Sequence, residues 1–518
     1  MKRRKFLQTT GAASLPILLN GMNVSTMSKS SLFSSINNDS DRVLVLIQLN
    51  GGNDGLQTIF PIDQYDKLAA VRQNIIVPEN QILSLTDTIG LHPTMSGVQS
   101  LYDDAKLAIV QSVGYPNQNR SHFRSTDIWT SGSPAQEFWT TGWLGRYFED
   151  LHPTFPEGYP NEENGDPFAI TIGNIVSETC QGAAANFSMT LSDPFNLAPL
   201  AEGEPGELPD TPYGDELQFL RTSIAQTNAY ADTVLSAAEG GNNVATYPDE
   251  NGLAQQLKNV ALLISGGLKT KVYVVSIGGF DTHANQVQAN EPTVGEHADL
   301  LSRVSEAMAV FQSDLQQLGL DERVISMTFS EFGRQIRSND AFGTDHGDAA
   351  PLMVFGSCVN PEIIGDNPQI PDEVAIQEGV PMQYDFRDIY GSILMDWFEV
   401  EESKVRSLLH QEFQHIPILN PCSDVTSTDD IITVDPLETA NYPNPFRDWT
   451  SIHFNCENAF VRLSIFNAHG SELKVLINKH LPAGKHEVRF DGSQLPAGNY
   501  YYRLQVGNHL KTKHMVKI

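Results

Sequence analysis

Basic residues, cysteines and long apolar segments are all scarce in this sequence. Its 518 residues include 33 Lys and Arg against 63 Asp and Glu, a net charge of −30. Because so acidic a surface repels phosphate groups, nucleic acid is not expected as a partner. The four cysteines form no CxxC pair, which argues against a zinc knuckle or a thioredoxin-like motif. The apolar run Gly11–Leu19 is too short to span a membrane, so no transmembrane helix is expected in the mature chain.

Charge divides the sequence into three parts. Residues 1–30 hold five basic residues and no acidic one, and residues 441–518 hold ten basic and five acidic residues. The stretch between them therefore carries a net charge of −40. Hydrophobic residues make up 40% of the chain, enough for a sizeable core. The length predicts about three units, or one large domain with an appendage.

The N-terminus predicts an export signal over residues 1–30, followed by a polar linker over residues 31–41. A basic start leads into a short apolar stretch of small residues, as in export signals. The segment Arg3–Leu7 resembles a twin-arginine signal, which implies the twin-arginine translocase as a partner. The alternative is an ordinary signal in which the two arginines are coincidental.

Residues 42–420 alternate strand and helix patterns. Runs that are apolar at nearly every position predict strands buried on both faces, and they occupy residues 42–50, 107–113, 271–277, 324–329 and 352–355. Helical patterns lie between them, as at residues 252–264 and 297–318. The alternation predicts an α/β fold with a doubly wound, mostly parallel sheet and helices on both faces. Within it, residues 149–216 are predicted to be an acidic loop or cap insertion.

The C-terminal part has a different residue pattern. After a linker at residues 421–436, short alternating runs between turns predict a small all-β sandwich over residues 437–518. We expect either a disulfide between Cys422 and Cys456, which an oxidising compartment would permit, or buried free thiols.

Three pieces of this part resemble the C-terminal sorting domain of the type IX secretion system, namely Tyr442–Phe446, Leu495–Leu504 and Lys511–Ile518. The resemblance implies the type IX secretion machinery as a partner. It also implies export across the inner membrane, followed by secretion or attachment at the outer cell surface. The alternative is a carbohydrate-binding or spacer sandwich.

Polar segments follow four of the predicted strands, and open α/β sheets build their sites at the carboxyl ends of strands. In Gly51–Gly55 the glycines allow a sharp turn that exposes Asp54 as a candidate metal ligand. In residues 115–129, Ser121 is placed to begin a helix, where free backbone N–H groups would meet an anionic oxygen. The alternative for Ser121 is a purely structural cap.

The other two polar segments are richest in metal-ligand types. Asp281 and His283 point the same way on an extended segment and suit Zn²⁺, Mn²⁺ or Fe, unless they form a simple Asp–His pair. Arg334 is suited to clamp a phosphate or sulfate, or to form a salt bridge with an acidic neighbour such as Glu331. Together the segments predict a divalent metal site built from Asp54, Asp281, His283, Glu331, Asp345 and His346.

The motifs between Arg42 and Glu399 resemble the exported family catalogued as domain of unknown function 1501, which is related to the alkaline phosphatase and sulfatase superfamily. The motifs are Gly51–Gly55, Asn119–Phe123, Gly142–Arg146, Gly279–His283, Ser330–Arg334 and Gly343–Gly347. The resemblance implies an alkaline-phosphatase-like fold and a metal-dependent hydrolase of phosphate or sulfate esters. Its substrate would be an anionic ester or a glycan.

The resemblance also implies roles for single residues. Ser121 would be the nucleophile, activated by a metal that Asp54 and Glu331 hold. The ligands of a second metal would be Asp281, His283 and His346. Arg334 or Arg120 would stabilise charge on the ester oxygens. Zinc is the expected metal, with manganese, calcium and iron as alternatives.

One ligand of the superfamily pattern is missing. If Glu331 fills the acidic position, Phe332 stands where a ligand histidine is expected. Pairing Asp345 with His346 instead leaves no late loop histidine, because His410 and His415 lie in a helical stretch. No cysteine stands in a Cys-x-Pro-x-Arg motif, which argues against a formylglycine sulfatase. The alternative function is a catalytically inactive member that binds a partner or glycan at the surface.

Overall fold

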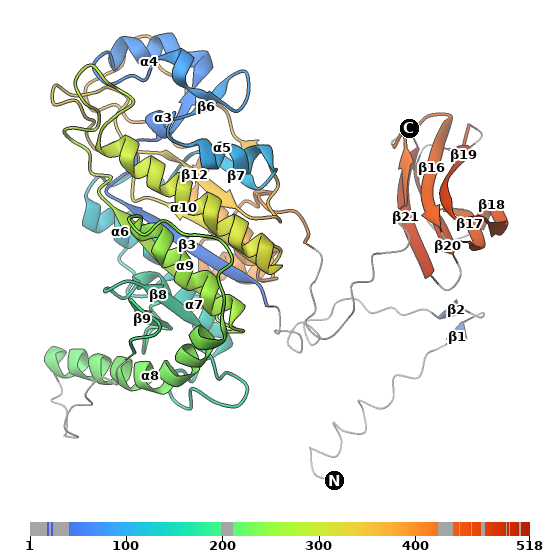
Figure 1. Cartoon of the computed structure of the whole chain (residues 1–518), viewed down its shortest axis with the longest axis horizontal. Helices are drawn as coiled ribbons and strands as arrows, with labels where there is room; N and C mark the ends of the chain where they lie inside the picture. The colour runs from blue at the N-terminus through green and yellow to red at the C-terminus, as the bar shows by residue number, and fades with distance from the viewer. Residues whose placement is uncertain are drawn as a thin grey trace. The chain divides into compact units, whose positions relative to one another are not determined.

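The chain divides into two units, Met1–Thr426 and Ser427–Ile518, each described here by itself (Figure 1). The computed structural model describes residues 18–19, 22–23, 41–197, 211–422, 439–444, 446–456, 458–467, 472–493, 495–496, 498–506 and 509–517. The predicted twin-arginine motif lies outside the described residues. Of the predicted signal, only the paired strands β1 (Leu18–Leu19) and β2 (Met22–Asn23) are described.

A nine-stranded sheet forms the centre of the first unit. Its order is β13 (Ile363–Ile364), β7 (Leu107–Gly114), β12 (Ala350–Phe355), β11 (Val324–Phe329), β3 (Val43–Asn50), β10 (Val272–Gly278), β8 (Ala169–Ile172) and β9 (Ser188–Leu191), with β14 (Tyr384–Asp385) also paired to β7. Strand β12 runs antiparallel to β11 and β7, and the other pairs in this sheet are parallel. The predicted mostly parallel α/β sheet is confirmed.

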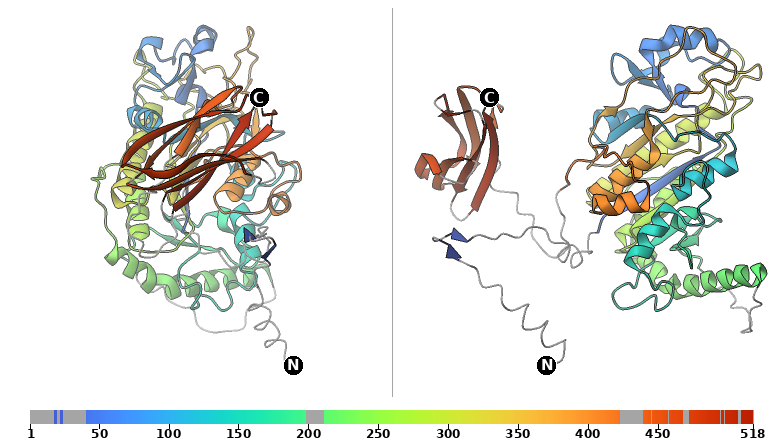
Figure 2. Two further views of the ribbon diagram at one scale, coloured as in Figure 1. Left: turned by 90° about the vertical axis from the view of Figure 1, so that its right-hand side faces the viewer. Right: turned by 180° about the vertical axis from the view of Figure 1, so that it is seen from behind.

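Helices cover both faces of the sheet. Val45 and Ile47 of β3 pack with the helices of one face, and Leu44 and Leu46 pack with those of the other. The first face carries α5 (Ser96–Asp103), α9 (Gly252–Ser265) and α10 (Glu296–Leu318) (Figure 1). The opposite face carries α6 (His122–Ser131), α7 (Trp143–Leu151), α11 (Phe386–Asp396) and α12 (Glu402–Leu408) (Figure 2, right). Because strand residues alternate between faces, a sheet covered on both sides requires strands that are apolar at almost every position.

The acidic stretch predicted as a loop or cap insertion contains regular structure. Its strands β8 and β9 pair with each other, and β8 pairs with β10, so they extend the central sheet. Residues 198–210 lie outside the described residues. Helix α8 (Pro212–Gly240) begins inside the predicted loop, where the side chain of Thr211 accepts a hydrogen bond from the Gly214 amide and a proline occupies the first turn. This capping starts a helix in a segment whose composition is typical of loops.

The remaining elements of the first unit are short. They are α3 (Gly55–Thr58), β4 (Ile59–Pro61), η1 (Ile62–Gln64), α4 (Tyr65–Val71), η2 (Glu79–Gln81), β5 (Leu83–Ser84), β6 (Ile89–Leu91) and η3 (Glu178–Cys180). Across the described parts of the chain, the helices are too short or too polar to cross a membrane.

Two antiparallel sheets form the second unit and enclose an apolar core. One sheet contains β15 (Thr439–Tyr442), β16 (Trp449–Cys456) and β19 (Gly484–Asp491). The other contains β18 (Glu472–Leu481), β17 (Ala459–Asn467), β20 (Gly498–Val506) and β21 (His509–Lys517). The predicted β-sandwich is confirmed. The predicted runs correspond to β16, β17, β19 and β20, and the structure adds β15, β18 and β21.

Of the two alternatives for Cys422 and Cys456, the disulfide between them is not formed, and the buried free thiol is found for Cys456 alone. Cys422 is bonded to Cys358, 64 residues earlier, and Cys456 is a buried free thiol. Backbone pairing explains the partner, because the Asn420 amide donates to the carbonyl of Cys358 and Val359 forms a bridge with Leu419. The end of the first unit is therefore held against the residues that follow β12.

Replacing Cys422 with serine should destabilise the first unit by about 4 kcal/mol, since the bond closes a long loop and restricts the unfolded chain. Denaturant unfolding in the absence of reductant measures the loss. The matched control is Cys456→Ser, which removes a free thiol of the second unit and should leave the unfolding of the first unit unchanged. Equal unfolding midpoints for wild type and Cys422→Ser would contradict a stabilising bond.

Candidate functional site

Strands β3, β10 and β11 lie side by side and run in the same direction, so the segments that follow them meet at one edge of the sheet. Gly51 and Gly52, directly after β3, have φ angles of 123° and 81°, which favour glycine. A Cβ on Gly51 would lie 2.3 Å from the backbone nitrogen of Asp281, and one on Gly52 would lie 2.3 Å from the ring of Phe332. The glycine turn thus allows close contact between the three strand ends.

Arg334 fixes this arrangement from inside. Its side chain is fully buried, and Nε and Nη1 donate to the carbonyl oxygens of Gly52 and Thr344 at 2.6 and 2.9 Å. Nη2 donates to the Asp281 carboxylate at 2.7 Å and to backbone carbonyls of neighbouring segments. Because its donors are used in this way, Arg334 positions Asp281 and is not available to clamp a substrate.

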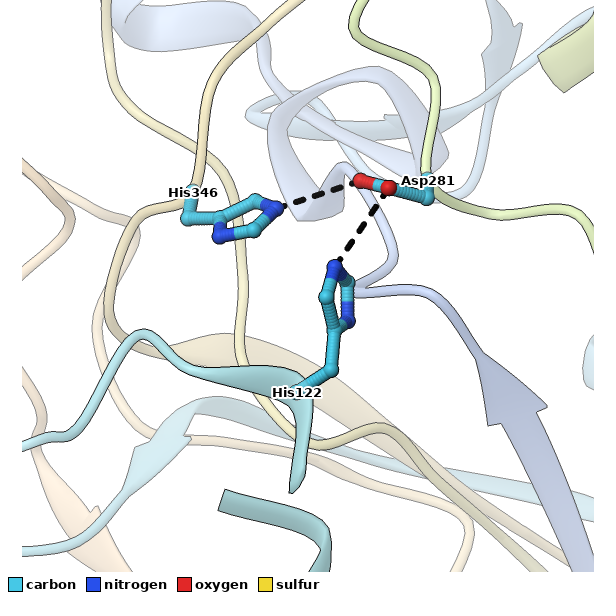
Figure 3. Close-up of side chains that lie close together, drawn as sticks. All are labelled: His122, Asp281 and His346. Carbon is cyan, nitrogen blue, oxygen red and sulfur yellow. Dashed lines mark hydrogen bonds and ion pairs between the residues drawn. The ribbon is translucent and has the colours of Figure 1, made fainter. Parts of the chain in front are cut away.

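Three imidazole rings converge on the Asp281 carboxylate. His283 Nε2 and His346 Nε2 lie 3.1 and 3.2 Å from Asp281 Oδ1, and His122 Nε2 lies 3.4 Å from Oδ2. Figure 3 shows His122 and His346 on two sides of Asp281. The rings come from distant segments: His122 begins α6, His283 follows β10 and His346 lies in the loop before β12.

Each ring is held through its other nitrogen. His346 Nδ1 lies 2.8 Å from the Arg120 carbonyl, His283 Nδ1 lies 2.8 Å from Asp345 Oδ1, and His122 Nδ1 lies 2.8 Å from Glu331 Oε1. A carbonyl or carboxylate oxygen only accepts, so each Nδ1 must carry the hydrogen. In a neutral ring the Nε2 lone pair then faces the centre of the cluster, as in histidines that bind a metal, whereas a protonated ring would donate from Nε2 to Asp281.

The centre of the cluster has the chemistry of a cation site. His283 Nε2 and His346 Nε2 lie 2.9 Å apart, and two lone pairs at that distance repel unless a proton or a metal ion lies between them. Burial raises the pKa of Asp281, but hydrogen bonding and charge from Arg334, with smaller effects of His346 and His283, hold it below its usual value. His122, Asp281 and His346 place two nitrogens and one ionised carboxylate within 4.8 Å of one another, and His283 Nε2 lies beside Asp281 and His346, a donor set of the kind that Zn²⁺ prefers.

Burial lowers the pKa of His346 more than its hydrogen bonds to the Arg120 carbonyl and Asp281 raise it. The ring is therefore held neutral, which is the state that binds a metal. The pKa of Asp345 is raised by burial but lowered more strongly by hydrogen bonds from His283 and Asn339. An ionised Asp345 behind His283 is the arrangement that orients a histidine ligand.

The predicted site residues fall into two groups. Asp281, His283 and His346 meet in the cluster, whereas Asp345 and Glu331 lie behind it as partners of its histidines. Glu331 is nearly buried and also accepts a hydrogen bond from the Gly51 amide.

Asp54 lies outside the cluster. Its carboxylate is fully buried and accepts hydrogen bonds from Arg72 Nη1 at 2.7 Å and Gln286 Nε2 at 2.6 Å. Burial raises the pKa of Asp54, but the charge and hydrogen bond of Arg72 outweigh it and hold the pKa below its usual value. Asp54 is thus committed to a buried ion pair.

Ser121 and Arg120 lie at the start of α6. Ser121 is the N-cap, but its exposed hydroxyl makes no capping hydrogen bond. Arg120 forms a two-point ion pair with Asp348, with N–O distances of 2.8 and 2.7 Å. The guanidinium is therefore occupied, and what Arg120 gives to the cluster is its backbone carbonyl.

His122 is the cluster residue that sequence reasoning missed, although it lies within the Asn119–Phe123 motif. Its signal was its position: a residue next to the predicted N-cap of a helix that begins at the site edge of the sheet. The ring of Phe332, at the place of the missing ligand histidine, packs 5.0 Å from His122 and 4.5 Å from His346 between ring centres. The expected ligand position therefore holds an apolar ring, and His122 from the start of α6 lies beside it.

A cleft of about 620 Å³ opens beside the cluster. His122, Asp281 and Glu331 are among its lining residues, and the others come from β3, β8, β10, α6 and the segment after β8. A group bound in this cleft would therefore contact the Asp281 carboxylate and the His122 ring.

Comparison with known proteins gives two family matches. Residues 41–395 match the family described as Protein of unknown function (DUF1501), and residues 440–518 match the Secretion system C-terminal sorting domain. No match was found among curated proteins. The sorting domain indicates export and secretion or attachment at the outer surface.

Solved structures similar to this chain include sulfatases and a member of the alkaline phosphatase superfamily. PsFucS1 sulfatase from Pseudoalteromonas sp. is 10% identical, with 89% of this chain and 88% of that chain covered and a TM-score of 0.33. An alkaline phosphatase superfamily protein from Vibrio parahaemolyticus is 9% identical, with coverage of 83% and 81% and a TM-score of 0.30. The phosphonate monoester hydrolase SpPMH from Silicibacter pomeroyi is 9% identical, with coverage of 92% and 89% and a TM-score of 0.34.

TM-scores this low support no conclusion about the activity of this protein. The family match is evidence of membership, because it spans most of the first unit and includes the motifs that supply the cluster. The chain therefore belongs to the family described as Protein of unknown function (DUF1501) and carries a C-terminal secretion sorting domain.

Proposed function

We propose that the protein is an exported hydrolase that uses one divalent metal to cleave phosphate or sulfate esters. The observation that carries this proposal is the convergence of three imidazole Nε2 atoms on Asp281 at the carboxyl ends of parallel strands. When bound, a divalent ion would supply positive charge to an ester oxygen and lower the pKa of bound water. Zinc is the metal that the donor set fits best.

The protein's own groups hold and orient this site. His122, His283, His346 and Asp281 provide the metal-binding atoms, and the hydrogen bonds that each Nδ1 donates fix which ring nitrogen faces the centre. Ser121 is the proposed nucleophile, because it adjoins His122 and its hydroxyl is exposed and not used in capping. Because Asp54 is bound to Arg72 and Glu331 to His122, we propose one ion instead of the two that the resemblance implies.

The test is metal content together with hydrolysis of 4-nitrophenyl phosphate and 4-nitrophenyl sulfate by the full chain. We expect about one equivalent of metal, activity lost with a chelator and restored by Zn²⁺, and little activity in Ser121→Ala despite bound metal. A matched control is Ser313→Ala, on the exposed side of α10. A metal-free, inactive protein would overturn the proposal. A metal-loaded protein that is inactive on both esters would favour the non-catalytic surface protein.

A further inference from the structure

The floor of the cleft beside the cluster breaks the apolar pattern of the sheet. On the face covered by α6 and α7, β3 presents Leu44 and Leu46 to the core, and the next residues on that face are Gln48 and Asn50. Strand β10 shows the same change from apolar to polar residues on this face, because its Ser276 is the register partner of Gln48. All three polar residues line the cleft. At these half-buried positions, where the apolar run of each strand ends, the sequence has amides and a hydroxyl.

Among the described residues, the side chains of these polar groups have no hydrogen-bond partner. The side chains of Gln48, Asn50 and Ser276 make no hydrogen bond to another residue in the described part of the chain, and neither does the hydroxyl of Thr126 on the α6 side of the cleft. The two amides offer both donors and acceptors, and the two hydroxyls can act as either. The cleft therefore offers mixed hydrogen-bonding groups to a ligand.

Apolar side chains border the same cleft. Phe123, next to His122 on α6, is 91% exposed, and Ile175 is 82% exposed. A large aromatic ring left in water at the edge of a polar cleft gives up favourable burial unless a ligand covers it. The ligand should therefore have an apolar face as well as hydrogen-bonding groups.

The charges of the lining disfavour an anionic ligand body. Among the described residues that line the cleft there are four carboxylates, Asp127, Glu178, Asp281 and Glu331, and no lysine or arginine. A second negative group on the ligand, away from the metal cluster, would meet only carboxylates and neutral groups.

We infer that the cleft binds an uncharged sugar unit, which carries the ester that the cluster acts on. Sugar hydroxyls both donate and accept hydrogen bonds, which matches Gln48, Asn50, Ser276 and Thr126, and the C–H face of a sugar ring covers an aromatic ring such as Phe123. The volume of about 620 Å³ suits one or two such units. The ester chemistry rests on the proposed function, whereas the binding of the sugar does not.

The test is binding of the full chain to immobilised uncharged oligosaccharides and to carboxylated counterparts that contain uronic acids. We expect the wild type to bind uncharged oligosaccharides more tightly than carboxylated ones. Gln48→Leu continues the apolar pattern of β3, so the fold should persist, and it should weaken binding at least tenfold. The matched control is Gln317→Leu on the exposed side of α10, which should bind like the wild type.

Two outcomes would overturn the inference: no binding to any uncharged oligosaccharide, or binding that Gln48→Leu leaves unchanged. A His283→Ala/His346→Ala variant, which changes two proposed ligands that do not line the cleft, separates this inference from the proposed function. It should lose the metal and any hydrolysis but keep oligosaccharide binding. Hydrolysis of aryl esters without oligosaccharide binding would refute the sugar site alone, and binding by an inactive protein would refute the hydrolase alone.

Discussion

Replacing His283 with alanine should lower the affinity of the protein for Zn²⁺ by more than about 100-fold. Loss of an outer partner of a metal-binding histidine already costs about 10- to 100-fold, and His283 is itself a proposed ligand. The variant also leaves Asp345 without the ring that it orients. Isothermal titration of chelator-treated protein with Zn²⁺ measures the difference, and metal analysis of the purified proteins gives an independent value.

The matched controls for this experiment come from the same domain. His415→Ala removes an exposed histidine that pairs with Asp396 outside the cluster, and it should bind Zn²⁺ like the wild type. Glu331→Gln should weaken binding by about 10- to 100-fold, because it removes only the negative charge behind His122. Equal affinity of His283→Ala and wild type would refute the ligand set.

Replacing Arg72 with methionine should destabilise the first unit by about 3–5 kcal/mol, because it leaves the Asp54 carboxylate buried without a countercharge. Both side chains are fully buried. Arg72 also donates to the carbonyls of Gln335 and Ile336, which join the segment after α4 to the segment after β11. Denaturant unfolding monitored by tryptophan fluorescence measures the loss.

A surface pair provides the comparison. Lys67→Met breaks an ion pair with Asp372 that is largely exposed, so it should cost less than about 1 kcal/mol. The double variant Arg72→Met/Asp54→Asn should be less destabilised than the sum of its single variants, because no buried charge is left unpaired. A loss of stability in Arg72→Met no larger than that in Lys67→Met would contradict the buried pair.

The parts of this structure that follow from local pattern could be predicted from the sequence. Runs such as residues 42–50 and 324–329 are mostly apolar on both faces of the strand, as a sheet covered on both faces requires. The topology of such a sheet then brings residues after β10 and β11 to one edge, which is why Asp281 and Glu331 could be placed near each other without coordinates.

The parts that depend on long-range partners could not be predicted. The sequence suggests Asp54 as a metal ligand, but in the structure its carboxylate accepts hydrogen bonds from Arg72 and Gln286. Neither partner is close to Asp54 in the sequence. His122 joins the cluster only because α6 begins beside the end of β11, where its ring reaches Glu331. The partner of Cys422 depends on backbone pairing near residue 359, which no composition or spacing reveals.

The bond between Cys358 and Cys422 has a mechanical consequence. The sorting domain is attached to the core through residues that follow Cys422. A force applied to that domain therefore reaches the core at this cysteine. The disulfide transmits this force directly to Cys358, which follows strand β12 of the central sheet. Helices α11 and α12 lie inside the 64-residue loop that the bond closes and carry none of this force. In the oxidised protein, tension during secretion would therefore bypass these two helices.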